Sequence, residues 1–260
     1  MYLKSGGADL YYEINGSGPD LVLIHPFPAN HAVWGPVAEL LSTRFRVILP
    51  DVRGLGQSAP GDGPATMEKH AEDLRRLIDE LGIGKAVFGG NSIGGYILFE
   101  FWRRFRERVA GLILVDTKAA ADSDDARKTR LAAADDVLNR GTQPFIDAQL
   151  PKLLGESTHR NRPDLVVEAR RMMMQASAAG IAAVQRGMAA RPDSNATLAS
   201  ITVPTLVVAG DEDGLTTPLE METMHRAIRG SIFRRIPKAG HYSPFEQPEE
   251  VHRVLRDFLT

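Results

Sequence analysis

The sequence predicts an α/β fold in which a mostly parallel central sheet carries helices on both faces. Short, wholly apolar runs such as Leu21–Ile24 and Val109–Val115 are typical of strands that are buried on both sides. Segments with helical periodicity, such as Thr66–Leu81, alternate with these runs, which favours parallel pairing with right-handed crossovers. A third observation is a long stretch, from Thr117 to about Ser200, that contains no convincing strand and interrupts the sheet with helices.

The first half of the chain alternates between predicted strands and predicted helices. Residues 8–14 alternate between polar and apolar side chains, as an edge strand does, and 15–19 are rich in turn-forming residues. Pro26 and Pro28 end the buried strand before them, because proline has no N–H to donate to a sheet. The predicted elements in this half are strands at 8–14, 21–24, 46–50, 86–88 and 109–115, and helices at 30–41, at 66–81 and directly after residue 92.

Beyond Asp116 the pattern becomes helical, and so long a connection without secondary structure would be unusual in a compact domain. We expect these helices to form a cap over the carboxyl edge of the sheet. Met172 and the methionines beside it suit an adaptable apolar pocket, although simple packing of the cap onto the body explains them equally well. The remaining predicted elements are helices at 124–139, 143–154, 163–177 and 178–190, a strand at 205–209, a helix at 218–228, a strand at 232–236, a loop at 237–248 and a helix at 249–259.

Composition narrows the range of partners and sites. The net charge of −2 gives no electrostatic reason to expect nucleic acid or an anionic membrane as a partner. No apolar run approaches the ~18 residues of a membrane-spanning helix, and the N-terminus carries no signal-peptide core. The absence of cysteine excludes disulfides and thiolate metal sites, and the histidines lack metal-ligand spacing. We therefore expect no metal, no membrane association, and a cytoplasmic protein that is a monomer or a small homo-oligomer.

The strongest local signal is Ser92, which lies inside the pattern Gly90-Asn91-Ser92-Ile93-Gly94 between a predicted strand and a predicted helix. A sharp strand-to-helix turn forces its central residue into a strained conformation, and small neighbours avoid clashes there. Such a turn holds the serine oxygen above the edge of the sheet, as a nucleophile requires. The alternative interpretation is a glycine-rich turn whose serine only caps the helix.

Further polar side chains follow other predicted strands. Ligands bind outside the carboxyl ends of the strands in an open parallel sheet, so these positions are candidate site positions. A serine, an acid and a histidine fall on this edge in the order Ser92, Asp213 and His241. Serine needs a histidine to take its proton, and that histidine needs a carboxylate to fix its tautomer. Asp116 and Asp211 also follow strands, and each remains an alternative for the acid.

Four segments together resemble the motifs of the α/β-hydrolase fold superfamily. Gly90–Gly94, Gly210–Asp213 and Ala239–His241 resemble its nucleophile, acid and histidine motifs, and Asp51–Ser58 is similar to its Asp-x-Arg-Gly-x-Gly-x-Ser loop. The resemblance covers the chain outside the helical insertion and is nearest to the small esterase, enol-lactonase and cofactor-free perhydrolase-like group. It implies an α/β-hydrolase core at 1–116 and 201–260 and a helical cap at 117–200, inserted after the sixth strand.

The resemblance also implies a role for individual residues. Ser92 matches the nucleophile, His241 the general base and Asp213 the acid. The backbone N–H groups of Phe27 and Ile93 match the oxyanion hole, although the chain has His25-Pro26 where the family usually has His-Gly. His25 is expected to brace the loop below that site. Substrate contacts are expected from Phe27, Asn91 and Met172, and no cofactor is expected.

The sequence therefore predicts a cofactor-free serine hydrolase that cleaves carboxylic esters or lactones through an acyl-enzyme intermediate. Its partner would be a small-molecule ester or lactone. A perhydrolase or a carbon–carbon bond hydrolase would use the same three residues, so both remain open. A slow-turnover receptor or signalling protein that keeps these residues is a non-enzymatic alternative. An inactive scaffold is disfavoured because all three residue types occur in order.

Overall fold

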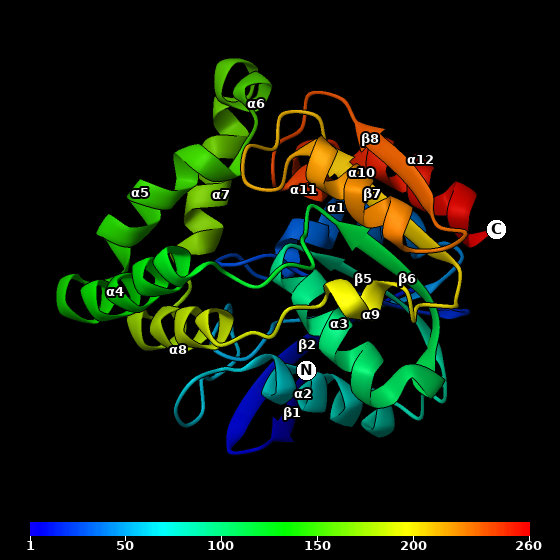
Figure 1. The fold of residues 1–260 in the computed structure, drawn as a ribbon, viewed down its shortest axis with the longest axis horizontal. Helices are drawn as coiled ribbons and strands as arrows, with labels where there is room; N and C mark the ends of the chain where they lie inside the picture. The colour runs from blue at the N-terminus through cyan, green and yellow to red at the C-terminus, as the bar shows by residue number, and fades with distance from the viewer.

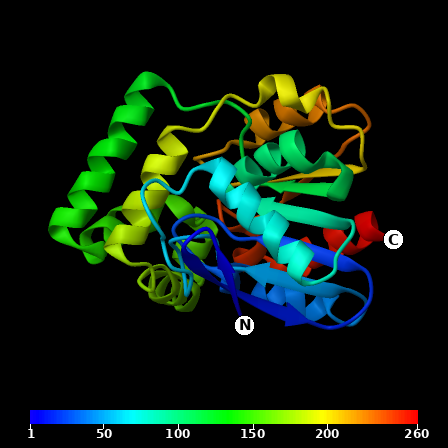
Figure 2. The same ribbon diagram turned by 90° about the horizontal axis from the view of Figure 1, so that it is seen from below.

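The computed structural model describes all 260 residues, and its central element is an eight-stranded sheet (Figures 1 and 2). The strands are ordered β1-β2-β4-β3-β5-β6-β7-β8. Pairing is parallel from β4 to β8 and antiparallel in the β1–β2 and β2–β4 pairs, which confirms the predicted mostly parallel sheet. The strands are β1 (Tyr2–Ser5), β2 (Ala8–Asn15), β3 (Asp20–Ile24), β4 (Arg46–Pro50), β5 (Ala86–Asn91), β6 (Val109–Val115), β7 (Thr205–Gly210) and β8 (Ile232–Ile236).

Helices cover both faces of this sheet, as the apolar strands require. Successive residues of β3 show the division, because Leu21 and Leu23 lie in one apolar cluster while Val22 and Ile24 lie in the other. The helices α2, α3 and α10 pack on the Val22 side, and α1 and α12 pack on the Leu21 side. Their bounds are α1 (Gly35–Leu41), α2 (Met67–Glu80), α3 (Ile93–Phe105), α10 (Pro218–Ala227) and α12 (Pro248–Leu259).

Outside the segment between β6 and β7, the structure departs from the sequence predictions at three places. The strand predicted at 8–14 is not an edge strand, because the unpredicted β1 pairs along its outer side. The helix predicted at 30–41 begins as a 3-10 turn, η1 (His31–Trp34), and α1 follows with Pro36 in its first turn, where a missing N–H costs nothing. The loop predicted at 237–248 contains the short helix α11 (Ser243–Glu246), which is too short to produce a periodic pattern.

Six helices connect β6 to β7, and five of them lie to one side of the sheet (Figure 1). The last one, α9, lies beside α3 instead, where Ser194 at its start and Thr197 within it both accept hydrogen bonds from Arg103. The sequence analysis predicts neither α6 nor α9, the two shortest of these helices. The domain division at 117 and 200 stays a prediction. The helices are α4 (Asp124–Arg140), α5 (Thr142–Leu153), α6 (Glu156–Asn161), α7 (Pro163–Met173), α8 (Ala178–Ala189) and α9 (Asn195–Leu198).

The helices also bear on a possible membrane association. We find none that combines the length and the apolar character needed to cross a bilayer. The buried apolar side chains of α4, α5, α7 and α8 instead belong to the main apolar cluster of the protein. Val137, Ile146, Met173 and Val184, for example, belong to the same buried cluster as the β3 residue Val22.

Candidate active site

Ser92 occupies a strained turn between β5 and α3. Its backbone has φ +56° and ψ −113°, a region that residues with a Cβ rarely adopt and that costs of order 1–3 kcal/mol. The neighbouring glycines are required, because a Cβ on Gly90 would overlap the backbone of Gly94, and one on Gly94 would lie 2.7 Å from the Ile24 carbonyl oxygen. The Ser92 side chain makes no capping hydrogen bond to α3. Ser92 stands at the N-cap position of α3, but its side chain does not cap the helix.

Two hydrogen bonds fix the backbone of this turn to the end of β6. The Ser92 N–H donates to the Val115 carbonyl over 2.9 Å, and the Thr117 hydroxyl donates to the Ser92 carbonyl over 2.7 Å. The turn is thus anchored on the strand beside it, which offsets the strain at Ser92. Ile93 opens α3, and the first N–H groups of a helix have no acceptor within the helix.

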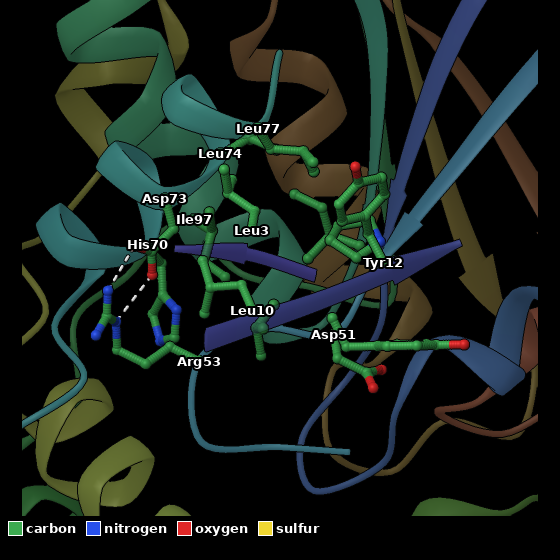
Figure 3. A pocket seen from close by; sticks show the side chains of 14 residues that line it. Leu3, Leu10, Tyr12, Asp51, Arg53, His70, Asp73, Leu74, Leu77 and Ile97 are labelled. Atoms are coloured by element: carbon green, nitrogen blue, oxygen red, sulfur yellow. Dashed lines mark hydrogen bonds and ion pairs between the residues drawn. The ribbon is translucent and has the colours of Figure 1, made fainter. Parts of the chain in front are cut away.

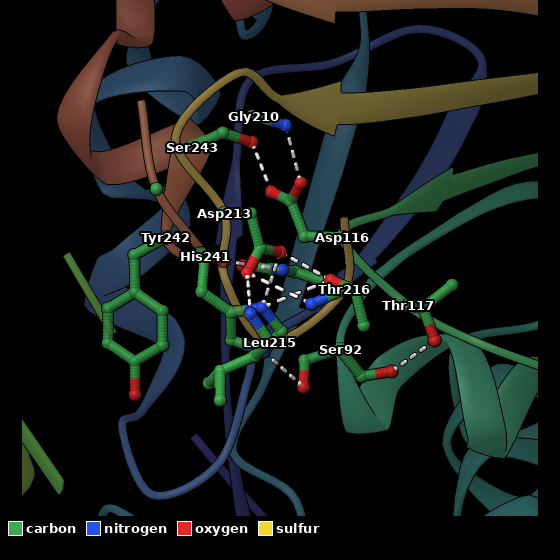
Figure 4. A network of polar contacts seen from close by, with 12 residues as sticks. Ser92, Asp116, Thr117, Gly210, Asp213, Leu215, Thr216, His241, Tyr242 and Ser243 are labelled. Atoms are coloured by element: carbon green, nitrogen blue, oxygen red, sulfur yellow. Dashed lines mark hydrogen bonds and ion pairs between the residues drawn. The ribbon is translucent and has the colours of Figure 1, made fainter. Parts of the chain in front are cut away.

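The structure brings Ser92, His241 and Asp213 into one chain of contacts, although they come from three separate strand ends (Figure 4). The Ser92 Oγ lies 2.7 Å from His241 Nε2, and His241 Nδ1 lies 2.8 Å from Asp213 Oδ2. All three residues are buried, with 8% of Ser92 still exposed. With Nδ1–H donating to the carboxylate, Nε2 is left free to accept the serine proton.

Asp213 is held in its ionised form by the loop that follows β7. Leu215 and Thr216 donate their backbone N–H groups to Oδ1 over 2.7 and 3.1 Å, and the Thr216 hydroxyl donates to Oδ2. Burial raises the pKa of Asp213, but the charge and hydrogen bond of His241 and the bonds from Thr216 outweigh burial and lower the pKa overall. Asp213 therefore presents a negative charge to His241.

The two alternative acids lie elsewhere. Asp116, at the end of β6, is fully buried and accepts from the Gly210 N–H over 2.7 Å and from the Ser243 hydroxyl over 2.5 Å (Figure 4). Burial, reinforced by the negative charge of Asp213, raises the pKa of Asp116 well above its usual value. Asp211 forms an ion pair with Arg235 at 2.5 Å near the surface. Neither carboxylate contacts His241.

Asn91 acts on His241 through the backbone and not on the cavity. Its side-chain amide donates to the carbonyl oxygens of His241 and Val115, over 3.1 and 3.3 Å. On the other side, the His241 N–H donates to the Leu153 carbonyl over 3.0 Å. The histidine is therefore fixed between β5 and the end of α5. Asn91 is completely buried and does not line the cavity at Ser92, so its expected contact with substrate finds no support.

Phe27, in the loop after β3, lines the cavity, and its backbone N–H has no acceptor in the protein. His25 braces this loop, since its Nδ1 donates to the Pro26 carbonyl over 2.9 Å and its Nε2 accepts from the Val52 N–H over 3.0 Å. Burial lowers the pKa of His25, which keeps the ring neutral and able to accept. The Tyr242 hydroxyl donates to the Phe27 carbonyl over 3.0 Å, which links this loop to the residue after His241.

A cavity of about 170 Å³ opens over Ser92 and His241. Phe27 lines it as expected, but Met172 does not. Met172 of α7 is buried in the main apolar cluster. Met188 of α8 lines the cavity instead. The complete lining is Phe27, Pro28, Ser92, Tyr96, Lys118, Arg130, Gln149, Leu153, Gln185, Met188, Leu215, Thr216 and His241.

Several of these lining residues escape prediction from the sequence. Thr216 and Lys118 follow strand ends by a few residues, so extending the reading of the sheet edge by two or three positions would have found them. Arg130 and Gln185 come from α4 and α8. No sequence signal marks them, because only the docking of these helices brings them to the cavity.

A second cavity, whose lining does not include Ser92, lies under the β1–β2 hairpin (Figure 3). It is mainly apolar, and its volume of about 30 Å³ suits no more than about one water molecule. Asp73 and Arg53 form a buried ion pair at its edge, with 2.6 Å between Oδ1 and Nη2. Burial and the Arg53 charge lower the pKa of His70 to about 3, so its ring is neutral. No serine lines this cavity.

The residues that could serve a metal are also scattered. No group of three or more His, Asp or Glu side chains is arranged to hold a metal ion. Ser92, His241 and Asp213 instead form a hydrogen-bonded chain from hydroxyl to imidazole to carboxylate. This arrangement is the one that nucleophilic attack by a serine requires.

Comparison with known proteins agrees with the fold. A family model described as "alpha/beta hydrolase fold" matches residues 19–248. The 3-oxoadipate enol-lactonase 1 of Acinetobacter baylyi is 28% identical over 263 residues, covering 100% of this chain and 96% of that protein. A malate-bound thermophilic esterase from Thermogutta terrifontis is 44% identical, with a TM-score of 0.95 over 97% of this chain and 93% of that one. The enol-lactonase of Burkholderia xenovorans is 28% identical, with a TM-score of 0.92 over 100% and 99% of the two chains. The chain therefore belongs to the alpha/beta hydrolase fold family.

Proposed function

We propose that the protein is a serine hydrolase that cleaves carboxylic esters or lactones. The observation that carries the proposal is the 2.7 Å contact between Ser92 Oγ and His241 Nε2 at the floor of an open cavity. The similarity to enol-lactonases and to an esterase supports this class of substrate. A cytoplasmic location and a monomeric or small homo-oligomeric state belong to the same proposal.

In the first half of the reaction, Ser92 Oγ attacks the carbonyl carbon of the substrate while His241 Nε2 takes the serine proton. Asp213 stabilises the imidazolium that forms. The carbonyl oxygen becomes an oxyanion, and we assign to the N–H groups of Phe27 and Ile93 the role of donating to it. The tetrahedral intermediate then collapses, and His241 returns the proton to the leaving alcohol.

In the second half, water attacks the acyl-serine ester with His241 again as the base. The second tetrahedral intermediate releases the carboxylic acid and regenerates the Ser92 hydroxyl. A lactone follows the same path, except that its alcohol stays attached to the acyl group until water releases the hydroxy acid. The strained turn keeps Ser92 at the cavity throughout both steps.

Replacing the nucleophile tests this proposal. We expect Ser92→Ala to lower kcat for 4-nitrophenyl acetate by at least about 10⁴-fold, because removal of a serine nucleophile disables both halves of the reaction. Release of 4-nitrophenol measures the rate. The control is Ser17→Ala, in an exposed turn, which should leave the rate unchanged. Substantial activity in Ser92→Ala would refute the proposed role of this serine.

A further inference from the structure

The charge of the cavity over Ser92 is unbalanced. Two cationic side chains, Lys118 and Arg130, line it together with the amides of Gln149 and Gln185. No aspartate or glutamate lines it. A neutral ester carries no charge that could pair with Lys118 and Arg130. Covering these two cations with a neutral substrate therefore costs free energy, whereas an anionic substrate would pair with them.

Hydrogen bonds hold the Arg130 guanidinium in place and leave some of its N–H groups without an acceptor. Its Nε donates to Asp122 over 2.6 Å and its Nη1 to Gln185 over 3.0 Å, while its Nη2 has no acceptor in the protein. Asp122 cannot cancel the charge of Arg130 completely, because the same carboxylate also pairs with Arg191 at 2.8 Å. Two arginines therefore share one buried carboxylate, and positive charge remains next to the cavity.

Lys118 reaches the cavity from the loop that follows β6, whereas Arg130 reaches it from α4. It follows Thr117, whose hydroxyl binds the Ser92 carbonyl, so its backbone is fixed close to the nucleophile. The ammonium donates to the Leu215 carbonyl over 3.0 Å, and its nearest acid, Glu220, is 4.0 Å away and half exposed. An ammonium has three donors, so two remain for a ligand.

We propose that the cavity recognises a carboxylate, and that the substrate is a short ester or lactone that carries a carboxylate besides its scissile carbonyl. This inference rests on the proposed function of Ser92. The free N–H groups of Arg130 suit a carboxylate, which arginine binds through paired hydrogen bonds, and Lys118 adds a second charge. The volume of about 170 Å³ suits a short substrate, since an engineered cavity of about 150 Å³ in another protein accommodates benzene.

A matched pair of substrates tests the inference. Monomethyl glutarate and dimethyl glutarate differ only in the free carboxylate, and methanol release reports both reactions at pH 7.5. We expect the wild-type protein to prefer the monoester in kcat/KM. Arg130→Gln should lower kcat/KM for the monoester by roughly 10- to 100-fold, the loss of one charge-assisted hydrogen bond, and change the diester value by less than about threefold.

Two further variants sharpen the test. Lys118→Gln should act in the same selective direction. Lys128→Gln, on the same helix as Arg130 but exposed to solvent, is the matched control and should change neither substrate. Equal rates for the two esters in the wild-type protein, or an equal loss for both esters in Arg130→Gln, would overturn the carboxylate site while leaving the serine hydrolase proposal intact.

Binding of glutarate, followed by calorimetry, separates this inference from the function on which it rests. Binding to the wild-type protein that weakens at least tenfold in Arg130→Gln supports the carboxylate site even if neither ester is hydrolysed, in which case the proposed reaction fails alone. Hydrolysis of the diester that requires Ser92, without any glutarate binding, refutes the carboxylate site alone. If the protein hydrolyses neither ester and does not bind glutarate, both the serine hydrolase proposal and the carboxylate site are refuted.

Discussion

One carboxylate among three candidates reaches the histidine, and the reason lies in the loop around it. Asp213 is fixed by three donors from Leu215 and Thr216, so its remaining acceptor capacity points at His241. The two carboxylate oxygens of Asp116 accept hydrogen bonds from the Gly210 N–H and the Ser243 hydroxyl. Sequence position alone cannot separate these acids, because all of them follow strands of the same sheet.

Replacing Asp213 by asparagine tests this assignment. We expect kcat for 4-nitrophenyl acetate to fall by roughly 10³- to 10⁴-fold with little change in KM, because an amide neither stabilises the imidazolium nor enforces the reactive tautomer. The control Asp211→Asn removes an exposed ion pair with Arg235 and should leave kcat within about twofold. Full activity in Asp213→Asn, or an equal loss in the control, would contradict the assignment.

Among the elements, α11 joins the histidine loop to the start of α6. Its Glu246 accepts from the N–H groups of Gly240 and Tyr242 through Oε1, over 2.9 and 3.3 Å. The other oxygen, Oε2, accepts from the Gly155 N–H over 2.7 Å and from the Thr158 hydroxyl over 2.6 Å. One buried side chain thus binds the residues on either side of His241 to the helical insertion that covers it.

Glu246→Gln removes this symmetry, because an amide must direct an NH₂ group at two donors. We expect the free energy of unfolding to fall by about 1–3 kcal/mol. We also expect a lower kcat with little change in KM, measured at a temperature well below the melting temperature, where the variant is folded. The exposed Glu249 is the control, and Glu249→Gln should alter neither quantity. Thermal unfolding and ester hydrolysis at 25 °C measure the two effects. A lower stability with an unchanged kcat would show that Glu246 does not position His241.

The elements that the sequence could predict are those with a strong pattern of their own. The apolar runs of β3, β4 and β6 identify strands that are buried on both faces, and the residues after β5, β7 and β8 identify the polar edge. Parallel pairing then places Ser92, Asp213 and His241 at the same edge, so their proximity follows from topology alone.

The elements that it could not predict depend on contacts with distant residues. β1 has four residues and forms by pairing with β2, and α6 and α11 are too short for periodicity to show. Met172 and Met188 have the same chemistry, yet only Met188 faces the cavity. The difference arises from how α7 and α8 dock, which the spacing of apolar residues within each helix does not determine.

At the scale of the whole molecule, a charged cluster fastens the antiparallel edge of the sheet to the helical layer. His31 of η1 lies between Asp51, at the end of β4, and Glu13 of β2, with 2.8 Å from Nδ1 to Asp51 and 3.3 Å from Nε2 to Glu13. Burial raises the pKa of Asp51, but the hydrogen bond and charge of His31, with the hydrogen bond from the Gln57 N–H, lower it overall. Burial lowers the pKa of His31, but its bonds to Asp51 and Glu13 raise it overall.

These directions make the stability of the fold depend on pH. A histidine whose pKa is raised on folding stabilises the protein fully below its unfolded value, near 6.5, and this contribution is lost as the pH rises through the folded value. We expect His31→Gln to lower the free energy of unfolding by about 1–3 kcal/mol at pH 6 and by progressively less as the pH rises to 8.5. Urea unfolding at pH 6, 7 and 8.5 measures the difference, with the exposed His159→Gln as the control. The sign is decisive, because a difference that stays constant or grows with pH would show that the Asp51–His31–Glu13 cluster does not bind a proton more tightly in the folded protein.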